Sequence, residues 1–159
     1  MSTLVSASII RNTLLDTITG RIESPNIVLG ECYLALSSTA PSYTATGEIT
    51  GITEPPSAQG YKRKLIGHYT EPSTILIGAA SKGEATNEDE IHFDQATEAA
   101  EGGTGWGNAI KYFAIYKTNT GGSPILAGEL TTEITVSAGY VVIIKAGDFK
   151  ISMNPVTGG

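Results

Sequence analysis

The clearest pattern of hydrophobic and polar positions lies in the last third of the chain, residues 104–153. An aromatic-rich run at 110–117 is followed by a turn cluster at 118–123 and a second apolar run at 124–130. Because Asn and Gly tolerate the positive φ angles of tight loops, two β-favouring runs joined by an Asn/Gly-rich segment predict a β-hairpin. We expect this hairpin to form the centre of a β-sandwich.

Alternation within these runs predicts which side chains are buried. In 110–117, Ile110, Tyr112, Ala114 and Tyr116 fall on one face and Lys111, Phe113, Ile115 and Lys117 on the other. Neither face is wholly polar, so this strand is expected to be central and covered on both sides. Further strands are predicted at 133–136, 140–145 and 148–153. The residues predicted for the core are Trp106, Tyr112, Phe113 and Phe149.

Four more strand signals precede this region. The segment 31–37 alternates with Cys32, Leu34 and Leu36 on the inner face, and Ile91 and Phe93 alternate in a short run between acidic residues. Segments 61–69 and 74–80 also favour strands. We therefore predict one domain, 1–159, that is mainly β. It is expected to be an antiparallel β-sandwich of jelly-roll type, with its main body at 61–153 and one N-terminal α-helix.

The helix is predicted within residues 1–20. Ile9, Ile10, Leu14 and Ile18 form an apolar stripe at helical spacing, and Gly20 is a natural stop. Such a stripe docks either on the protein's own sheet or on another subunit, and we expect the sheet.

Two segments are candidate contact surfaces. Residues 37–60 are polar and proline-containing, which indicates a long exposed loop, although a plain connector has the same composition. The only basic cluster, at 62–64, is expected to protect a sheet edge or to form salt bridges with an acidic neighbouring subunit. The candidate contact residues are Ile9, Ile10, Leu14, Ile18, Tyr43, Pro55, Pro56, Tyr61, Lys62, Arg63 and Lys64.

Composition narrows the functional classes. The chain has 159 residues and a net charge of −6, which argues against a nucleic-acid partner. No apolar run reaches the roughly 18 residues of a membrane span, and no secretory signal is evident, so we expect folding in a cytosol. The lone Cys32 is expected to be a small buried hydrophobic residue.

No catalytic or metal-binding constellation emerges. His68 and His92 each lie in a strand-like context, without a nucleophile and base around them. The glycines of 102–105 lack the Lys-Ser/Thr and the helix of a phosphate loop. The acidic stretch 84–101 lacks the spacing of a calcium loop, so a solvated acidic edge is the expectation. We expect no enzyme activity, no cofactor and no metal.

Four segments in the same order carry a resemblance: CYLALSSTAPS, TEPPSAQGYKRKLI, EIHFDQAT and the tail from YFAIYKTNTGG to IKAGDFKISM. Together they resemble small bacteriophage virion proteins often labelled tail fibre proteins. The resemblance covers nearly the whole chain and implies a virion protein assembled in the host bacterial cytoplasm.

Two virion roles follow from this resemblance. Because the chain has no shaft repeats, we expect a non-enzymatic outer capsid decoration (cementing) protein that oligomerises as a homotrimer and contacts the major capsid protein or another virion protein. The alternative is a short tail or head fibre that recognises a host surface glycan, with Tyr43 and Tyr61 available to stack on sugars.

Overall fold

The computed structural model describes residues 5–6, 16, 19, 30–68, 71–81, 84–98 and 105–152. Within these residues the chain is mainly β, with antiparallel pairing. In chain order the elements are β1 (Val5–Ser6), β2 (Glu31–Ser37), β3 (Ser42–Tyr43), β4 (Ile49–Thr50), the 3-10 helix η1 (Ser57–Gln59), β5 (Lys64–His68), the 3-10 helix η2 (Pro72–Thr74), β6 (Glu84–Thr86), β7 (Ile91–His92), β8 (Ile110–Tyr116), β9 (Leu126–Ile134), β10 (Ile143–Ile144) and β11 (Lys150–Ser152).

One antiparallel sheet organises the molecule, with strand order β1-β9-β8-β2-β5. The predicted hairpin is confirmed, because β8 pairs with β9 across the turn and also pairs with β2 on its other side. Strand β2 has the predicted bounds, and Leu34 and Leu36 are fully buried as expected. The central position of β8 therefore follows from its two apolar faces.

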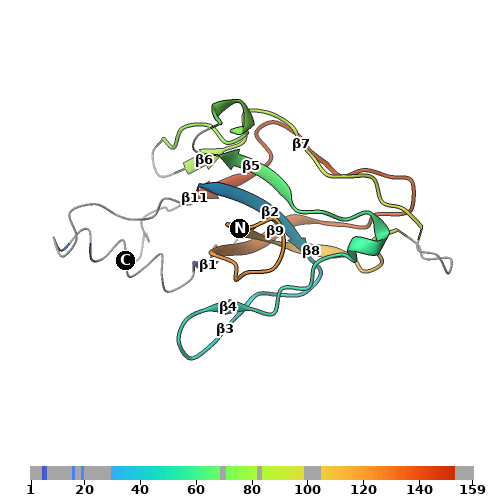
Figure 1. Cartoon of the computed structure of the whole chain (residues 1–159), viewed down its shortest axis with the longest axis horizontal. Coiled ribbons are helices and arrows are strands. Elements are labelled where there is room, and N and C mark those ends of the chain that lie inside the picture. Colours follow the sequence, from blue (N-terminus) through green and yellow to red (C-terminus); the bar gives the residue numbers. More distant parts are fainter. Residues whose placement is uncertain are drawn as a thin grey trace.

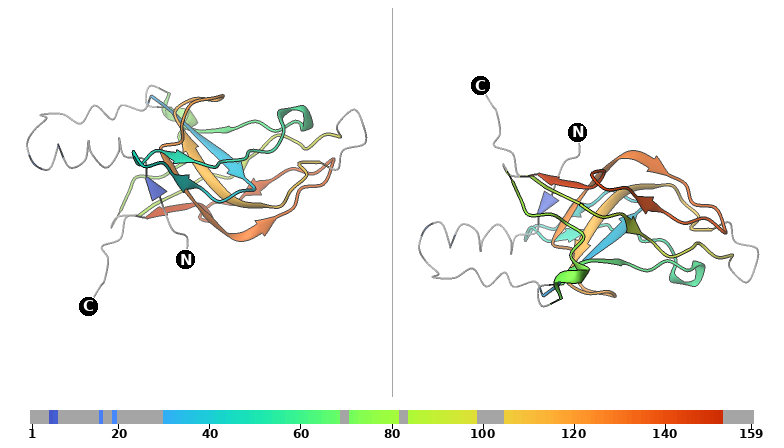
Figure 2. Two further views of the ribbon diagram at one scale, coloured as in Figure 1. Left: turned by 90° about the horizontal axis from the view of Figure 1, so that it is seen from below. Right: turned by 90° about the horizontal axis from the view of Figure 1, so that it is seen from above.

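The two faces of this sheet are covered by different layers (Figures 1 and 2). One face packs in the main core against the ribbons β7–β10 and β6–β11, and this core contains Ile91, Phe113 and Phe149. A smaller core on the other face contains Ile49 of the β3–β4 hairpin and Tyr116. The molecule is thus layered as a sandwich around the long sheet.

Aromatic side chains fill the main core. Trp106 is 2% exposed and meets the Tyr61 ring edge-on, with centroids 5.2 Å apart. Phe113 and Phe149, each 4% exposed, also form an edge-to-face pair at 5.2 Å. These arrangements suit the quadrupoles of aromatic rings. Tyr112, which was predicted for the core, is instead half-buried.

A register shift explains one error in the predicted alternation. Ile110 pairs with Ile134 but Tyr112 pairs with Glu129, so the ladder is interrupted between Ile110 and Tyr112. An irregularity of this kind breaks the strict two-residue period of a strand. Ile110 consequently joins the core that contains Phe113, and not the opposite face as predicted.

The start of the predicted N-terminal helix is wrong. Val5 and Ser6 form strand β1, which pairs with Ala127 and Leu126 at the edge of β9. Pairing with the edge of the sheet outweighs the short helical pattern here, because a β-branched residue such as Val5 favours a strand. The stripe residues Ile9, Ile10, Leu14 and Ile18 lie outside the described residues.

The predicted loop 37–60 has more structure than expected. It contains the β3–β4 hairpin and η1, and Ile49 is 2% exposed. The Ser37 hydroxyl receives hydrogen bonds from the backbone N–H groups of Thr39, at 3.2 Å, and Thr53, at 3.0 Å. The Ser37 side chain thus provides a hydrogen-bond acceptor for two backbone N–H groups, which in an exposed loop would bond to water.

Other strand predictions are corrected in detail. Segment 74–80 forms only a bridge between Ile77 and Asn87, and segment 140–145 forms only the two residues of β10. The pairing shows one five-stranded sheet and three two-stranded ribbons among the described residues, which does not establish a jelly roll. None of the helices in the described part is long and apolar enough to cross a membrane.

Candidate functional site

An open cleft of about 980 Å³ lies along β5, between the 54–57 segment and the 118–121 turn. Its volume is near the upper end of the range found for small-ligand sites. The cleft is lined by Tyr33, Glu54, Pro55, Ser57, Tyr61, Lys62, Arg63, Lys64, Leu65, Thr74, Leu76, Asp94, Asn119, Thr120 and Gly121.

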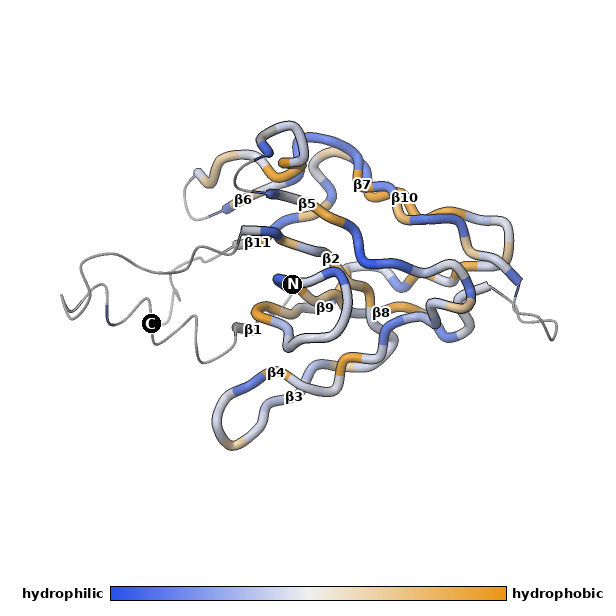
Figure 3. Tube along the Cα trace, viewed as in Figure 1, coloured by the Kyte–Doolittle hydropathy of each residue, from blue (hydrophilic) through white to orange (hydrophobic). Residues whose placement is uncertain are grey.

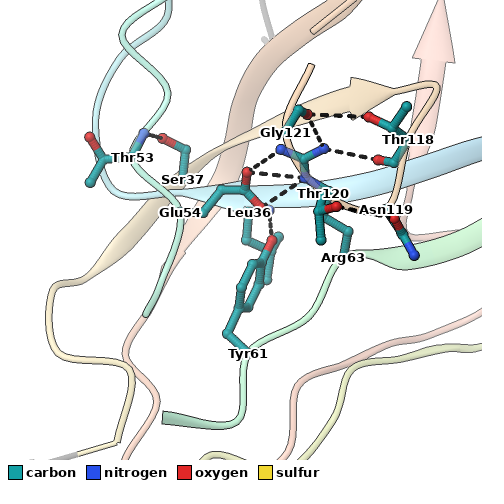
Figure 4. Close-up of polar contacts among 10 residues, drawn as sticks. All are labelled: Leu36, Ser37, Thr53, Glu54, Tyr61, Arg63, Thr118, Asn119, Thr120 and Gly121. Atoms are coloured by element: carbon teal, nitrogen blue, oxygen red, sulfur yellow. Dashed lines mark hydrogen bonds and ion pairs between the residues drawn. The ribbon is translucent and has the colours of Figure 1, made fainter. Parts of the chain in front are cut away.

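Arg63 and Glu54 form a buried ion pair in the wall of this cleft (Figure 4). Arg63 Nε donates to both carboxylate oxygens of Glu54, at 3.1 and 3.0 Å, and Nη2 donates to Oε1 at 2.6 Å. The Arg63 side chain is only 6% exposed and that of Glu54 23%. A two-nitrogen contact of this kind fixes orientation as well as charge.

The same guanidinium also holds the 118–121 turn. Its Nη1 donates to the carbonyl oxygens of Thr118 at 2.9 Å and Gly121 at 2.7 Å (Figure 4). Its carbon Cζ lies 3.4 Å from the centroid of the Tyr116 ring, a cation–π contact. One side chain therefore ties the 118–121 turn to the segment that carries Glu54, and both contribute to the cleft lining.

Tyr61 anchors the base of this network. Its hydroxyl oxygen accepts a hydrogen bond from the backbone N–H of Leu36 at 2.9 Å, and the residue is 4% exposed. Burial raises the pKa of the Tyr61 phenol above its ordinary value of 10.0, and the Glu54 charge acts in the same direction. Tyr61 is therefore a neutral structural residue and not the exposed contact that was predicted.

The accessible part of the cleft has a different chemistry. Lys62, 78% exposed at its side chain, lies 3.4 Å from an Asp94 oxygen. Lys64 is half-buried, and its side chain makes no hydrogen bond or ion pair within the described part of the chain. Leu65 and Leu76 add apolar surface. The accessible lining therefore combines cationic, acidic and apolar side chains.

The predicted contact residues are therefore only partly together. Lys62, Lys64 and Pro55 line the cleft, although Pro55 is buried. Tyr43, 51% exposed, lies in β3 outside the cleft lining, and Pro56 is exposed. Arg63 was predicted to be a surface charge, but its side chain is buried. It pairs with Glu54, nine positions away, and donates hydrogen bonds to two carbonyl oxygens of the 118–121 turn.

Sequence reasoning missed a second surface. Tyr140, Val141 and Ile143 are 68%, 49% and 44% exposed, beside a hollow of about 370 Å³. Exposed apolar residues gathered in this way are typical of contact sites. The hydrophobic colouring of β7 and β10 in Figure 3 shows that this ribbon carries apolar positions next to polar ones. The run 140–145 was predicted only as a strand, and the exposure of these side chains in the structure identifies the surface.

Other candidate chemistry is dispersed over the surface. His92 Nε2 lies 2.9 Å from a Glu90 oxygen, and His68 lies 3.7 Å from Glu71. Within the described residues no three His, Cys, Asp or Glu side chains are placed to hold a metal ion. Cys32 is half-buried, and burial raises the pKa of its thiol to about 11.

Comparison with known proteins places this β domain in a family. No curated protein matches the chain. The model of the family described as Podophage GP4 fiber I protein gp80 matches residues 6–152, which include both walls of the cleft and strands β2 to β11. The chain therefore belongs to the podophage GP4 fiber I protein gp80 family and is a phage virion protein of fibre type.

Proposed function

We propose that this protein is a short fibre component of a podophage-type particle, and that its β domain contacts the bacterial surface. The family description supports the fibre assignment. The observation that carries the surface contact is the open cleft of about 980 Å³, in whose lining Arg63 ties the 118–121 turn to Glu54. A site held rigidly before binding loses less conformational entropy when its ligand arrives.

The role proposed for the cleft is binding without hydrolysis. A glycosidase needs one carboxylic acid and one carboxylate, both free to act on the bond between two sugars. Of the two carboxylates that line the cleft, Glu54 is held by Arg63 and Asp94 lies beside Lys62. Both are engaged with cations, which favours recognition over catalysis.

A second candidate is an outer capsid decoration protein. The exposed side chains of Tyr140, Val141 and Ile143 favour it, because a neighbouring virion protein or a second copy of the chain would remove them from water. A homotrimer joined through this surface fits both candidates, since fibres and decoration proteins each assemble from copies of one chain.

Labelling of intact phage particles separates the two roles. Antibody fragments against the purified protein, imaged on particles by electron microscopy, should bind at the tail or at a fibre for the proposed function. The purified protein should also compete with phage for adsorption to host cells. Labels arranged regularly over the shell, together with no competition, would instead establish decoration.

A further inference from the structure

Three exposed apolar side chains lie together next to the β7–β10 ribbon. Tyr140, Val141 and Ile143 make up three of the five large hydrophobic side chains that are exposed in the described part of the chain. Single exposed apolar side chains are ordinary on a protein surface, whereas a group of them marks a contact site. The other two, Tyr43 and Ile75, lie in separate segments of the sequence.

The backbone that carries this group is fixed. The N–H of Phe93 donates to the carbonyl oxygen of Val142 at 3.0 Å, and the N–H of Ala96 donates to that of Tyr140 at 2.9 Å. Val142, between the exposed residues, is buried in the main core. The surface is therefore held in place before a partner arrives, which lowers the entropy lost on binding.

The outer edge of β10 is open. Because the carbonyl of Val142 points towards β7, the backbone groups of Val141 and Ile143 point away from β7. Among the described residues no hydrogen bond is made to these outward groups. An open strand edge beside exposed apolar side chains is a place where another polypeptide attaches. This surface therefore favours a protein partner.

The same surface contains both a projecting ring and a hollow. The hollow of about 370 Å³ is lined by residues 134–137 and 140–143, and the exposed Tyr140 belongs to this lining. A cavity of roughly 150 Å³ is enough to hold a benzene ring, so the hollow can receive an aromatic side chain. One copy of the chain can therefore offer its Tyr140 ring to the hollow of a second copy.

The charges near this surface also favour a second copy. On the ribbon and next to it the charged side chains are Glu90, Asp94 and Lys145, and Lys62 lies 3.4 Å from Asp94. Two carboxylates and two ammonium groups balance here, although the whole chain carries −6. A net charge of one sign opposes the association of identical chains, and a locally neutral face reduces that repulsion.

We propose that the surface formed by residues 134–137 and 140–143 joins copies of this chain, with the Tyr140 ring of one copy in the hollow of the next. Val141 and Ile143 lie beside that ring and are removed from water with it. The assignment rests on the proposed function for its setting, a fibre built from copies of one chain, and it names the partner of this surface.

The test is sedimentation velocity of the full chain over a range of protein concentrations. The wild type should form assemblies of two or more copies. Tyr140→Ala and Val141→Glu should each weaken association by about tenfold or more, because a few central residues, tyrosines among them, carry most of the free energy of an interface. Tyr140→Phe keeps the ring and should leave association nearly unchanged.

Tyr43→Ala and Ile75→Glu are the matched controls, because they make comparable changes at exposed residues outside the lining of the hollow. Urea denaturation of each variant checks that it is folded. A wild type that is monomeric at every concentration, or equal weakening in variants and controls, would overturn the proposal. A monomeric wild type that binds phage particles through Tyr140 would overturn it too, and would assign the surface to another virion protein.

Amide hydrogen exchange gives a second measurement. The amides of Val141 and Ile143 have no acceptor within the described part of one chain, so they should exchange more slowly as the wild type assembles. In Tyr140→Ala their exchange should stay fast at the same protein concentrations. Exchange that does not change on assembly would place the contact elsewhere and refute the assignment.

Adsorption separates this inference from the proposed function. If the wild type assembles through this surface but does not compete with phage for host cells, the interface stands and the adsorption role is wrong. If the wild type competes and Tyr140→Ala remains fully assembled, the fibre role stands and the interface assignment is wrong.

Discussion

Arg63 holds Glu54 through both Nε and Nη2, in a pair whose two side chains are 6% and 23% exposed. The attraction between these charges is balanced against the cost of removing them from water. The Arg63 guanidinium also donates hydrogen bonds to the carbonyl oxygens of Thr118 and Gly121. These contacts, rather than the ion pair alone, connect separate parts of the chain.

Arg63→Ala should destabilise the protein by about 3 kcal/mol or more, because Glu54 is then left without its partner in a mostly buried position. Urea denaturation followed by tryptophan fluorescence measures this, since Trp106 is the only tryptophan. Lys111→Ala is the matched control: Lys111 lies 2.8 Å from Glu133, but both side chains are about half exposed. Similar losses in the two variants would contradict the role of burial.

Tyr61→Phe should cost about 1–3 kcal/mol, because it removes one oxygen and leaves the buried N–H of Leu36 without an acceptor. The ring stays, so the contacts with Trp106 and Phe93 are retained. Tyr140→Phe makes the same chemical change at a residue that is 68% exposed and should leave the midpoint unchanged. Equal midpoints for both variants and the wild type would refute this assignment.

Cys32 links stability to alkaline pH. Its ordinary thiol pKa is 9.0, and burial raises it to about 11 in the folded chain. Between these values the unfolded chain has released a proton that the folded chain retains, so the free energy of unfolding falls as pH rises from 9.0 towards 11. Well below pH 9.0 the thiol is protonated in both states and contributes no pH dependence.

Cys32→Ala should flatten that part of the curve, measured by urea denaturation at several pH values between 8 and 11. The buried phenol of Tyr61 adds a fall of the same sign above its ordinary pKa of 10.0, so Tyr61→Phe provides the comparison. In the native protein, iodoacetamide should modify Cys32 slowly at neutral pH and rapidly once urea is added. Fast native modification would show that the thiol is not protected.

Gly105→Ala should be strongly destabilising. Gly105 has φ +69, and a Cβ there would lie 2.3 Å from the carbonyl oxygen of Val136 and 2.6 Å from the Ser137 carbonyl carbon. Gly107→Ala is the control: φ is +77, yet a Cβ meets nothing within 4 Å, so only the backbone cost of about 1–2 kcal/mol remains. In thermal denaturation, Gly105→Ala should have the lower melting temperature of the two variants. Equal melting temperatures would show that residues 136–137 move and accommodate the added methyl group.

The sequence predicted those parts of the fold that depend on neighbouring residues. The β8–β9 hairpin and β2 were found because alternation and turn residues are local signals. The burial of Arg63 was not predictable in this way, because its partners lie 9, 55 and 58 positions away. A charged residue in an alternating run is placed at the surface unless its distant counter-charge is known.

The candidate site shows the same division. The basic run 62–64 was recognised as a contact surface, and the structure separates it into one structural arginine and two lysines that line the cleft. The exposed Tyr140 was missed because the apolar run 140–145 was predicted only as a strand. Only tertiary structure shows that β10 is two residues long and that Tyr140 and Val141 are exposed while Val142 is buried.

The contacts of Arg63 also bear on the order in which the chain folds. The β8–β9 hairpin closes across a short turn, whereas Arg63 must meet residues as far as 58 positions along the chain. Forming contacts at such separation carries a larger loop-closure entropy and slows folding. We expect the hairpin to form early and the contacts of Arg63 with Thr118 and Gly121 to form late. A chain emerging from the ribosome would then lack the complete cleft until residue 121, the last in its lining, had been made.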